Sequence, residues 1–152
     1  MSEVILRHAD NRDTERLVVV WRAAVEATHH FLEPADVDGF ASRLPTEFFP
    51  AVEVVVAEID GVVSGFSGTA GNRLEMLFVD PVWHGRGVGT TLLTRAVRAA
   101  GVDELDVNED NPGAVAFYRA RGFEQVGRSP VDADGRPFPI LHFRRAGVSV
   151  LE

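Results

Sequence analysis

The segment FVDPVWHGRGVGTTLLTRAV, residues 78–97, constrains the fold most, because three alternating glycines separate an apolar run from a stretch of helical character. The first four N–H groups of a helix have no partner inside it, and the helix dipole places partial positive charge there. Without side chains at Gly85, Gly87 and Gly89, a phosphate can approach those N–H groups closely. The alternative is a tight turn without a ligand. The segment therefore predicts a strand-to-helix connection that is either an anion site or a structural turn.

Length and composition limit the classes of protein. A chain of 152 residues fits one domain, residues 1–152. The charged N-terminal segment has no signal-peptide core, and no apolar run reaches the roughly 18 residues of a membrane span, so we expect a cytoplasmic protein without a membrane partner. The absence of cysteine excludes disulfides and a cysteine nucleophile. A net charge of -8 without a basic cluster argues against a nucleic-acid partner.

Periodicity and turn residues predict the order β-α-α-β-β-β-α-β-α-β-β, an α/β domain. Expected strands cover residues 3–7, the two runs of 52–70 around the Asp60-Gly61 turn, 73–79, 104–108, 123–129 and 138–145. Expected helices cover residues 11–32, a weaker segment from Pro34 to Pro45, residues 90–100, and a segment from Pro112 that stops at Gly122. The first strands predict an antiparallel meander, and the later strand-helix-strand units predict parallel pairing.

The glycine segment does not match the common nucleotide loops. A P-loop has Lys followed by Ser or Thr after its last glycine, whereas Gly89 is followed by Thr90 and Thr91. The dinucleotide fingerprint requires a glycine where Thr90 stands. A kinase glycine loop joins two strands, and this segment leads into a helix.

Two motifs resemble those of the GNAT superfamily of N-acetyltransferases. VDPVWHGRGVGTTLL is similar to the acyl-CoA-binding motif Gln/Arg-x-x-Gly-x-Gly/Ala, with His84 at the Gln/Arg place, and NPGAVAFYRARGF is similar to the second signature, Asn-x-x-Ala-x-x-Phe-Tyr-x-x-x-Gly-Phe. ATHHFL and GRSPVDADGRPFPILHF further resemble the YjaB-like bacterial branch. The resemblance implies a mixed, mostly antiparallel sheet of about seven strands flanked by four helices, and acetyl-CoA as acyl donor with CoA as product.

The resemblance assigns cofactor contacts to three segments. The strand before the loop pairs its backbone with the pantetheine arm, although its apolar residues also fit a core strand. The loop binds the pyrophosphate chiefly through backbone N–H groups. Asn111 contacts the cofactor in the family and is also a good helix N-cap. The implied cofactor residues are Leu77, Phe78, Val79, His84, Gly85, Arg86, Gly87, Val88, Gly89, Thr90, Asn111 and Phe117.

Two residues are candidates for proton transfer. Tyr118, the one tyrosine of the chain, matches the family position that protonates the leaving thiolate, and a phenol with a pKa near 10 stays protonated at neutral pH. Its alternative role is an aromatic anchor on the helix. Glu75 shares strand parity with Leu77 and is the candidate general base. Its alternative is an exposed carboxylate or an ion pair.

The end of the first helix is where the family builds its acceptor pocket. His29 and His30 offer groups that titrate near neutral pH, and about 100° separates them on a helix, so at most one faces the pocket. Expected acceptor-binding residues are Trp21, Thr28, His29, His30, Phe31 and His142, with core packing as the alternative for Trp21 and a packed or exposed histidine for His142. We expect no metal site. By analogy with the family, a homodimer is one expected assembly.

The leading hypothesis is an acetyl-CoA-dependent N-acetyltransferase that acts on a primary amine of a small molecule or a peptide. A non-catalytic acyl-CoA-binding sensor with the same fold is the alternative, against which Tyr118 argues. A protein that binds ATP or a dinucleotide is the third, and the failed loop patterns count against it.

Overall fold

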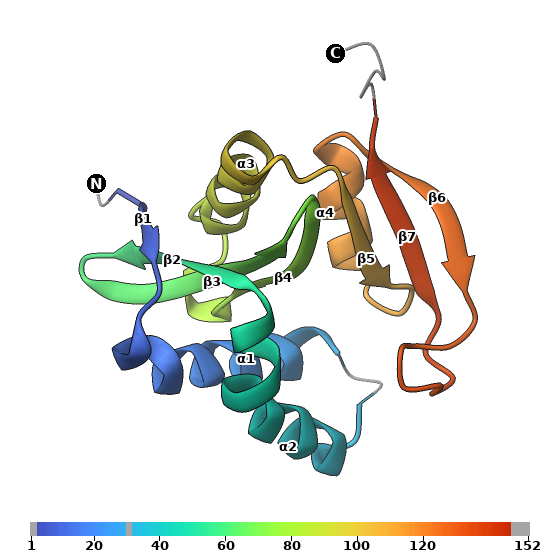
Figure 1. Cartoon of the computed structure of the whole chain (residues 1–152), viewed down its shortest axis with the longest axis horizontal. Coiled ribbons are helices and arrows are strands. Elements are labelled where there is room, and N and C mark those ends of the chain that lie inside the picture. The colour runs from blue at the N-terminus through green and yellow to red at the C-terminus, as the bar shows by residue number, and fades with distance from the viewer. Residues whose placement is uncertain (1–2, 30–31, 147–152) are drawn as a thin grey trace. The chain divides into compact units, whose positions relative to one another are not determined.

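The computed structural model describes residues 3–29 and 32–146. Within these residues the chain forms seven β-strands and four α-helices. It divides into two compact units, unit 1 (Met1–Val102) and unit 2 (Asp103–Glu152). Each unit has its own strands and helices (Figure 1).

Unit 1 contains four antiparallel strands in the order β1-β2-β3-β4. Its elements are β1 (Ile5–His8), α1 (Thr14–Thr28), α2 (Pro34–Arg43), β2 (Glu53–Ile59), β3 (Val62–Ala70), β4 (Arg73–Val79) and α3 (Val88–Ala100). Short turns of helix precede α1 (Asn11–Asp13), follow α2 (Leu44–Phe48, Phe49–Ala51) and follow β4 (Pro81–Trp83). The expected meander is confirmed.

Helices cover both faces of the unit 1 strands, with α3 on one face and α1 and α2 on the other (Figure 1). Successive side chains of a strand point to opposite faces, and along β2 the side chains on both faces are apolar. This explains why helices cover both faces. Val56 packs with residues of α1 and α2, such as Trp21. Val55 and Ala57 pack with Leu92 of α3. The strand is therefore apolar on both sides, as a strand covered on both faces requires.

The β2-β3 hairpin forms where Asp60-Gly61 predicts it. Asp60 has φ of 53° and Gly61 has φ of 78°, which are the left-handed conformations that a two-residue hairpin turn requires. The weaker helix also forms, and α2 ends at Arg43, just before Pro45 as expected. The chain continues as a π-helical turn over Leu44–Phe48. Proline has no N–H to donate and its ring clashes in a regular helix, so a wider turn accommodates Pro45.

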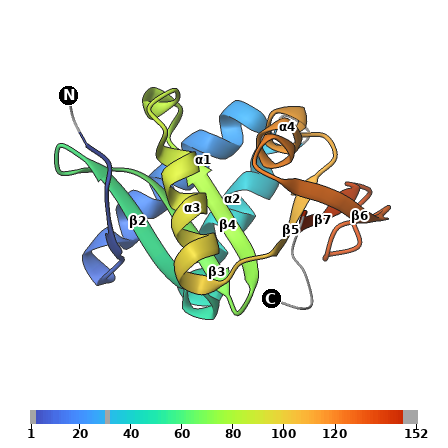
Figure 2. The same cartoon turned by 90° about the horizontal axis from the view of Figure 1, so that it is seen from above.

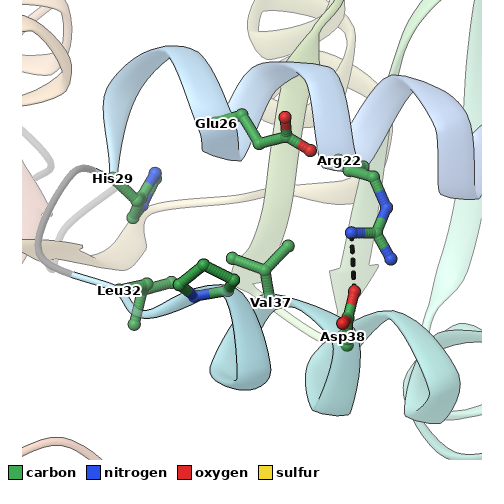
Figure 3. A pocket seen from close by; sticks show the side chains of 7 residues that line it. Arg22, Glu26, His29, Leu32, Val37 and Asp38 are labelled. Carbon is green, nitrogen blue, oxygen red and sulfur yellow. Dashed lines mark hydrogen bonds and ion pairs between the residues drawn. The ribbon is translucent and has the colours of Figure 1, made fainter.

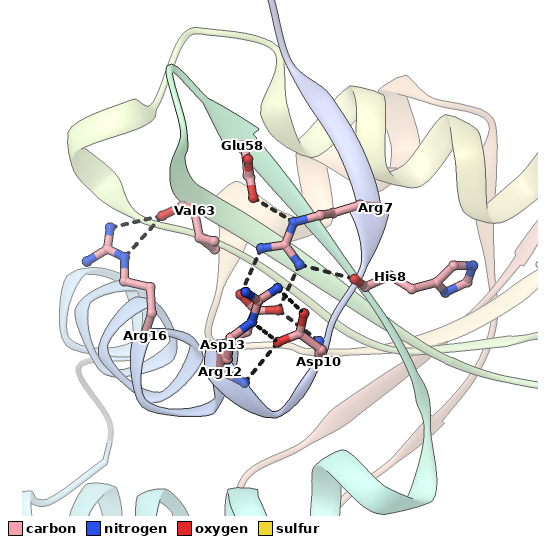
Figure 4. A network of polar contacts seen from close by, with 8 residues as sticks. All are labelled: Arg7, His8, Asp10, Arg12, Asp13, Arg16, Glu58 and Val63. Atoms are coloured by element: carbon pink, nitrogen blue, oxygen red, sulfur yellow. Dashed lines mark hydrogen bonds and ion pairs between the residues drawn. The ribbon is translucent and has the colours of Figure 1, made fainter.

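Arg7 ties the first strand to its neighbours (Figure 4). Its guanidinium donates two hydrogen bonds of 2.8 Å to the carboxylate of Asp13 and one of 2.6 Å to Glu58 on β2. Asp13 is buried, and its carboxylate also accepts from the backbone N–H of Asp10 at 2.8 Å. The hydrogen bonds from Arg7 lower the pKa of Asp13 below its ordinary value. The network joins β1, β2 and the start of α1.

Asp13→Asn is expected to reduce the free energy of unfolding at pH 7 by about 2 kcal/mol, because a charge-assisted bidentate contact is lost. A carboxyl whose pKa is lowered by folding stabilises the protein above its unfolded pKa, near 4, and that stabilisation is lost as the pH falls through the folded pKa. The difference between wild type and variant should therefore shrink below about pH 4. Urea unfolding at pH 7 and at several acidic pH values measures it.

The unfolding of wild type and Asp13→Asn must be compared at each pH, because Asp10 also titrates at acidic pH and would by itself change the stability of either protein. The hydrogen bond from Arg12 lowers the pKa of Asp10 to about 2, and this contribution is common to wild type and variant. A difference in unfolding free energy that stays constant from neutral to acidic pH would show that the charge of Asp13 is not what stabilises the network.

Unit 2 consists of β5 (Glu104–Asn108), α4 (Pro112–Ala120), β6 (Phe123–Ser129) and β7 (Ile140–Arg145). Its strands pair antiparallel in the order β5-β7-β6. The parallel pairing expected for the unit β5-α4-β6 is therefore wrong, because β7 lies between the two strands. Helix α4 lies along one side of these strands (Figure 2). Tyr118 of α4 contacts Phe123 at a ring separation of 6.1 Å, and the guanidinium of Arg119 lies 5.8 Å from the ring of Phe143. The face of unit 2 that carries Phe143 is therefore the face that α4 covers.

In the part of the chain that the structure describes, no helix combines the length and the apolar character needed to cross a membrane.

Candidate functional site

Helix α3 begins on a left-handed glycine. Gly87 is its N-cap with φ of 77°, and Gly85 has φ of 81°. The first bond of the helix runs from Thr91 N–H to the Gly87 carbonyl at 2.9 Å, and the Thr91 hydroxyl donates to the same oxygen at 2.7 Å. The N–H groups of Gly87, Val88 and Gly89 precede that bond, so the helix gives them no carbonyl partner. This loop end has the donors and the dipole of an anion site.

The three glycines serve two purposes. Gly85 and Gly87 have backbone conformations that disfavour a side chain, so for them the expectation of a tight turn is confirmed. Gly89 lies inside α3, which begins at Val88, two residues earlier than expected. A helical position makes no demand for glycine, and glycine there costs stability. Turn geometry therefore does not explain Gly89, and close approach of a ligand to the helix N-terminus stays a prediction.

Two contacts hold the loop in place at the end of β4. The buried carboxylate of Asp80 accepts from Val82 N–H at 3.1 Å and from the Arg16 guanidinium of α1 at 3.1 Å. Gly65 on β3 lies so close that an added Cβ would meet the carbonyl oxygen of Phe78 at 2.8 Å and a methyl of Val88 at 2.9 Å. A side chain at position 65 would therefore force the Phe78 carbonyl of β4 or the Val88 side chain of α3 to shift.

The side chains of the loop point to different environments. Val88 is buried, whereas His84 and Arg86 are exposed. The Arg86 guanidinium lies 5.4 Å from the centre of the Trp83 ring, within the range of a cation–π contact. Thr90 is exposed in the first turn of α3. Of these residues, Arg86 adds a positive charge beside the helix N-terminus.

Strand β4 carries a bulge at Glu75. Gly68 of β3 pairs with Met76 and Thr69 pairs with Leu74, so Glu75 is the extra residue. An extra residue shifts the alternation by one position. The expected parity of Glu75 with Leu77 is therefore wrong. Leu77 and Val79 pack with the α3 side, whereas Met76 and Phe78 pack with α1 and α2.

Because of the bulge, Glu75 and Met76 both face a cavity of about 480 Å³ inside unit 1. Its walls are mostly apolar, and Glu75 is the acidic residue among them. The lining residues are Trp21, Phe40, Leu44, Phe48, Ala51, Val52, Ala70, Glu75, Met76 and Phe78. The Glu75 carboxylate accepts a hydrogen bond from the Arg73 guanidinium at 3.0 Å, which is the ion pair expected as its alternative role. Trp21 is part of the core and also lines the cavity.

His29 lines a second cavity of unit 1, of about 400 Å³, between α1 and α2 (Figure 3). The Thr28 hydroxyl donates to the Ala24 carbonyl at 2.7 Å, so its oxygen accepts from Nδ1 of His29 at 2.8 Å. The acceptor-pocket residues are thus divided, with Trp21 in one cavity and His29 in the other, and Thr28 lines neither. His30 and Phe31 lie outside the described residues.

Unit 2 places the second motif on α4. Asn111 is the N-cap, and its side-chain oxygen accepts from Ala114 N–H at 3.2 Å, which confirms the structural role expected for it. Tyr118 is buried, and its ring makes an edge contact with Phe117 at 5.2 Å. The Phe117 ring lies under the Arg121 guanidinium at 3.8 Å. The aromatic packing expected as the alternative role of Tyr118 is therefore present.

Burial raises the pKa of Tyr118 above its ordinary value, because the charged phenolate is poorly solvated there. The phenol therefore keeps its proton throughout the neutral range. This is the protonation state that a general acid needs.

His142 is held on both ring nitrogens. Its Nδ1 lies 2.7 Å from a carboxylate oxygen of Asp106, and its Nε2 lies 2.7 Å from the Ser129 hydroxyl. His142 is thus a bonded histidine that is partly exposed, and neither Asp106 nor Ser129 was a predicted site residue.

The model of the acetyltransferase (GNAT) domain family matches residues 17–139, most of the chain. The chain belongs to the GNAT family of acetyltransferases. Peptidyl-lysine N-acetyltransferase YjaB of Salmonella typhimurium is 36% identical over 138 residues, covering 90% of this chain and 94% of that protein. YjaB of Escherichia coli is 37% identical over 146 residues, covering 95% of this chain and 98% of that protein. The N-acetyltransferase class and the resemblance to the YjaB-like branch are confirmed.

The solution structure of apo-form YjaB from Escherichia coli has the same fold as this GNAT protein. The two match with a TM-score of 0.87 at 33% sequence identity, covering 96% of this chain and 99% of the other. The expected fold class, a GNAT-like α/β domain with seven strands and four helices, is confirmed for the described residues.

Sequence reasoning missed several residues that shape this GNAT site. Arg16 and Asp80 are 64 positions apart, and nothing in the sequence indicates that they pair. Gly65 gave a weak signal, because a glycine inside a β-branched strand suggests a bulge or a close backbone approach. Asp106 and Ser129 gave none, because their contacts with His142 depend on the register of three strands.

Proposed function

We propose that this GNAT domain transfers the acetyl group of acetyl-CoA to the side-chain amine of a lysine in a peptide or protein. The observation that carries the proposal is the N-terminus of α3, where two left-handed glycines and the otherwise unexplained Gly89 expose backbone N–H groups. The names of the curated relatives support lysine as acceptor, because they describe peptidyl-lysine acetyltransferases.

The residues present fit the pyrophosphate of CoA. Backbone N–H groups of residues 87–89 would hold the phosphate oxygens, and Arg86 would add charge. The side chains of Leu77, Phe78 and Val79 pack into the core and one edge of their backbone pairs with β3, so in this proposal the pantetheine arm would pair with the other edge. Acetyl-CoA supplies an activated acyl group whose thiolate is a good leaving group.

The cavity beside Glu75 suits a lysine side chain. The lysine stem is a chain of methylenes with a charged tip, and it packs favourably against apolar walls while a carboxylate contacts its ammonium. Trp21, Met76 and Phe78 supply such walls, and Glu75 supplies the carboxylate. In this proposal Glu75 orients the ammonium, and Tyr118 donates its proton to the leaving thiolate.

Thermal unfolding with acetyl-CoA, CoA, ATP and NADH, each added separately, tests the cofactor. A ligand at about 100 times its Kd stabilises by roughly 2.7 kcal/mol, which raises the Tm of a domain of this size by about 5–10 °C. We expect this rise with CoA and acetyl-CoA and none with NADH or ATP. Thiol release in the presence of lysine peptides then tests transfer.

The outcomes separate the three hypotheses. A rise in Tm with the CoA compounds but no thiol release with any lysine peptide or free amine would favour the acyl-CoA sensor. A rise with ATP or NADH alone would favour a nucleotide-binding protein. No rise with any ligand at saturating concentration would leave the glycine segment as a structural turn.

A further inference from the structure

The cavity beside Glu75 is larger than the lysine side chain proposed for it. Its volume is about 480 Å³. At about 30 Å³ for each heavy atom, the volume that a water molecule takes in the liquid, the five heavy atoms of a lysine side chain fill about 150 Å³. Roughly two thirds of the cavity therefore remains for a bulkier acceptor.

The walls of this space are rich in aromatic rings. Trp21, Phe40, Phe48 and Phe78 all line the cavity. Aromatic groups pack on one another edge-on or in offset stacks, and cavities of this size with apolar walls and few polar groups are typical sites for small organic ligands. An aromatic ring therefore complements these walls better than a bare chain of methylenes does.

The wall rings are held in place by contacts within unit 1. The Trp21 ring meets the Phe78 ring edge-on, with 6.5 Å between their centres, and Phe78 in turn contacts the buried ring of Phe66 at 5.7 Å. The Arg43 guanidinium lies 4.6 Å from the centre of the Phe48 ring. Because these contacts hold the walls without a ligand, an aromatic group that enters has less ordering of side chains to oppose it.

The cavity runs from an exposed rim to a buried interior. Glu75 and Ala70 are exposed, whereas Trp21 and Leu44 are buried. The Glu75 carboxylate accepts from the Arg73 guanidinium at 3.0 Å, and a carboxylate has about four lone-pair sites, so it can also accept from an ammonium. The complementary ligand has a primary ammonium at one end and an aromatic ring a short chain away.

Strand β4 connects this cavity to the cofactor segment proposed above. Glu75, Met76 and Phe78 line the cavity, and Leu77, Phe78 and Val79 form the segment proposed to pair with the pantetheine arm. Phe78 belongs to both sets. Residues of a strand are about 3.3 Å apart, so an amine held by Glu75 lies within about 10 Å of that segment.

We propose that the cavity makes this protein an acetyltransferase of arylalkylamines, small primary amines that carry an aromatic ring on a short alkyl chain, in addition to peptidyl lysine. This inference rests on the transferase function proposed above. The bound ammonium loses one proton to solvent, and the nitrogen electron pair forms a bond to the acetyl carbon. The carbon–sulfur bond breaks with its electron pair on sulfur, and the thiolate takes the second proton that the nitrogen loses. The products are the N-acetylated amine and CoA.

Binding of amines to the protein alone tests the cavity without any transfer. Phenethylamine has the ring and the ammonium, butylamine has the ammonium on the chain of a lysine side chain, and hydrocinnamate has the ring with a carboxylate in place of the ammonium. By isothermal titration at pH 7, we expect phenethylamine to bind about 10–100-fold more tightly than butylamine. Hydrocinnamate should bind at least about tenfold more weakly than phenethylamine. Equal Kd values within either pair would overturn the proposal.

Phe48→Leu and Phe49→Leu are a matched pair of variants. Both phenylalanines are partly buried, and of the two it is Phe48 that lines the cavity. Phe48→Leu should weaken the binding of phenethylamine about fivefold, because one wall ring is lost, whereas Phe49→Leu should leave it unchanged. Glu75→Gln should weaken both amines about tenfold and should not weaken hydrocinnamate. Equal effects of the two leucine variants would show that Phe48 does not contact the ring and would overturn the assignment of the cavity.

Thiol release from acetyl-CoA then tests the activity. We expect a kcat/KM for phenethylamine at least about tenfold above that for butylamine, since the ring is bound in both the ground state and the transition state. Release with a lysine peptide but not with phenethylamine would overturn the second activity alone. Release with phenethylamine but not with any lysine peptide would support this inference and would count against lysine as the acceptor. Failure of CoA itself to bind, with the amine Kd values as expected, would count against the proposed function.

Discussion

Tyr118→Phe is expected to lower kcat for acetyl transfer by about 10²–10³-fold, because the leaving thiolate loses its proton donor. The Kd for CoA should change little, since phenylalanine keeps the ring that packs against Phe117 and Phe123. Stopped-flow thiol release under saturating acetyl-CoA measures kcat, and a binding titration measures Kd. The Tm of the variant is the check that the aromatic packing is intact.

A second acyl donor sharpens the test of Tyr118. An acetyl thioester of p-nitrothiophenol has a leaving group that needs no proton, so wild type and Tyr118→Phe should acylate amines with it at similar rates. Equal rates with acetyl-CoA itself would contradict the general-acid role of Tyr118. Equal losses with both donors would show that the hydroxyl acts on something other than the leaving group.

Gly89→Ala is expected to weaken CoA binding by at least about tenfold, or roughly 1.4 kcal/mol, while the free energy of unfolding rises. The rise, of about 0.5–1 kcal/mol, follows from the better helix propensity of alanine at a position inside α3. The methyl group would stand where the ligand approaches the N–H groups. Isothermal titration with CoA and urea unfolding of the free protein measure the two effects.

The chain offers a matched control in Gly39, which lies inside α2, is exposed and has nothing within 4 Å of an added Cβ. Gly39→Ala should gain the same stability with no change in CoA affinity. Gly85→Ala should instead lose stability, by about 1–2 kcal/mol, because its left-handed backbone strains any side chain. If Gly89→Ala binds CoA as tightly as Gly39→Ala does, close approach is not the reason for this glycine.

The sequence was informative wherever the structure depends on local chemistry. Asp60-Gly61 predicted a hairpin and Asn111-Pro112 predicted a helix start, because turn and cap preferences act over a few residues. Prediction failed where one extra residue changed the alternation. The bulge at Glu75 moves this carboxylate into the apolar cavity, and no local pattern distinguishes it from a regular strand.

The site was predicted less completely than the fold for the same physical reason. The glycine loop and Tyr118 belong to contiguous motifs, so the sequence contains them whole. The chain of Asp106, Ser129 and His142 exists only after three strands have paired in one register. The ion pair of Arg16 and Asp80 likewise needs α1 to pack beside the end of β4.

The cation–π contact between Arg86 and Trp83 has an optical consequence. Indole emission responds to a nearby cation and to displacement of that cation, and the Trp83 ring has the Arg86 guanidinium beside it. The other tryptophan of the chain, Trp21, lines the proposed acceptor cavity. One fluorophore therefore stands at each proposed binding surface. In Trp21→Phe the emission of Trp83 reports binding at the glycine loop. In Trp83→Phe the emission of Trp21 reports binding in the acceptor cavity. The order in which donor and acceptor bind becomes visible without any label.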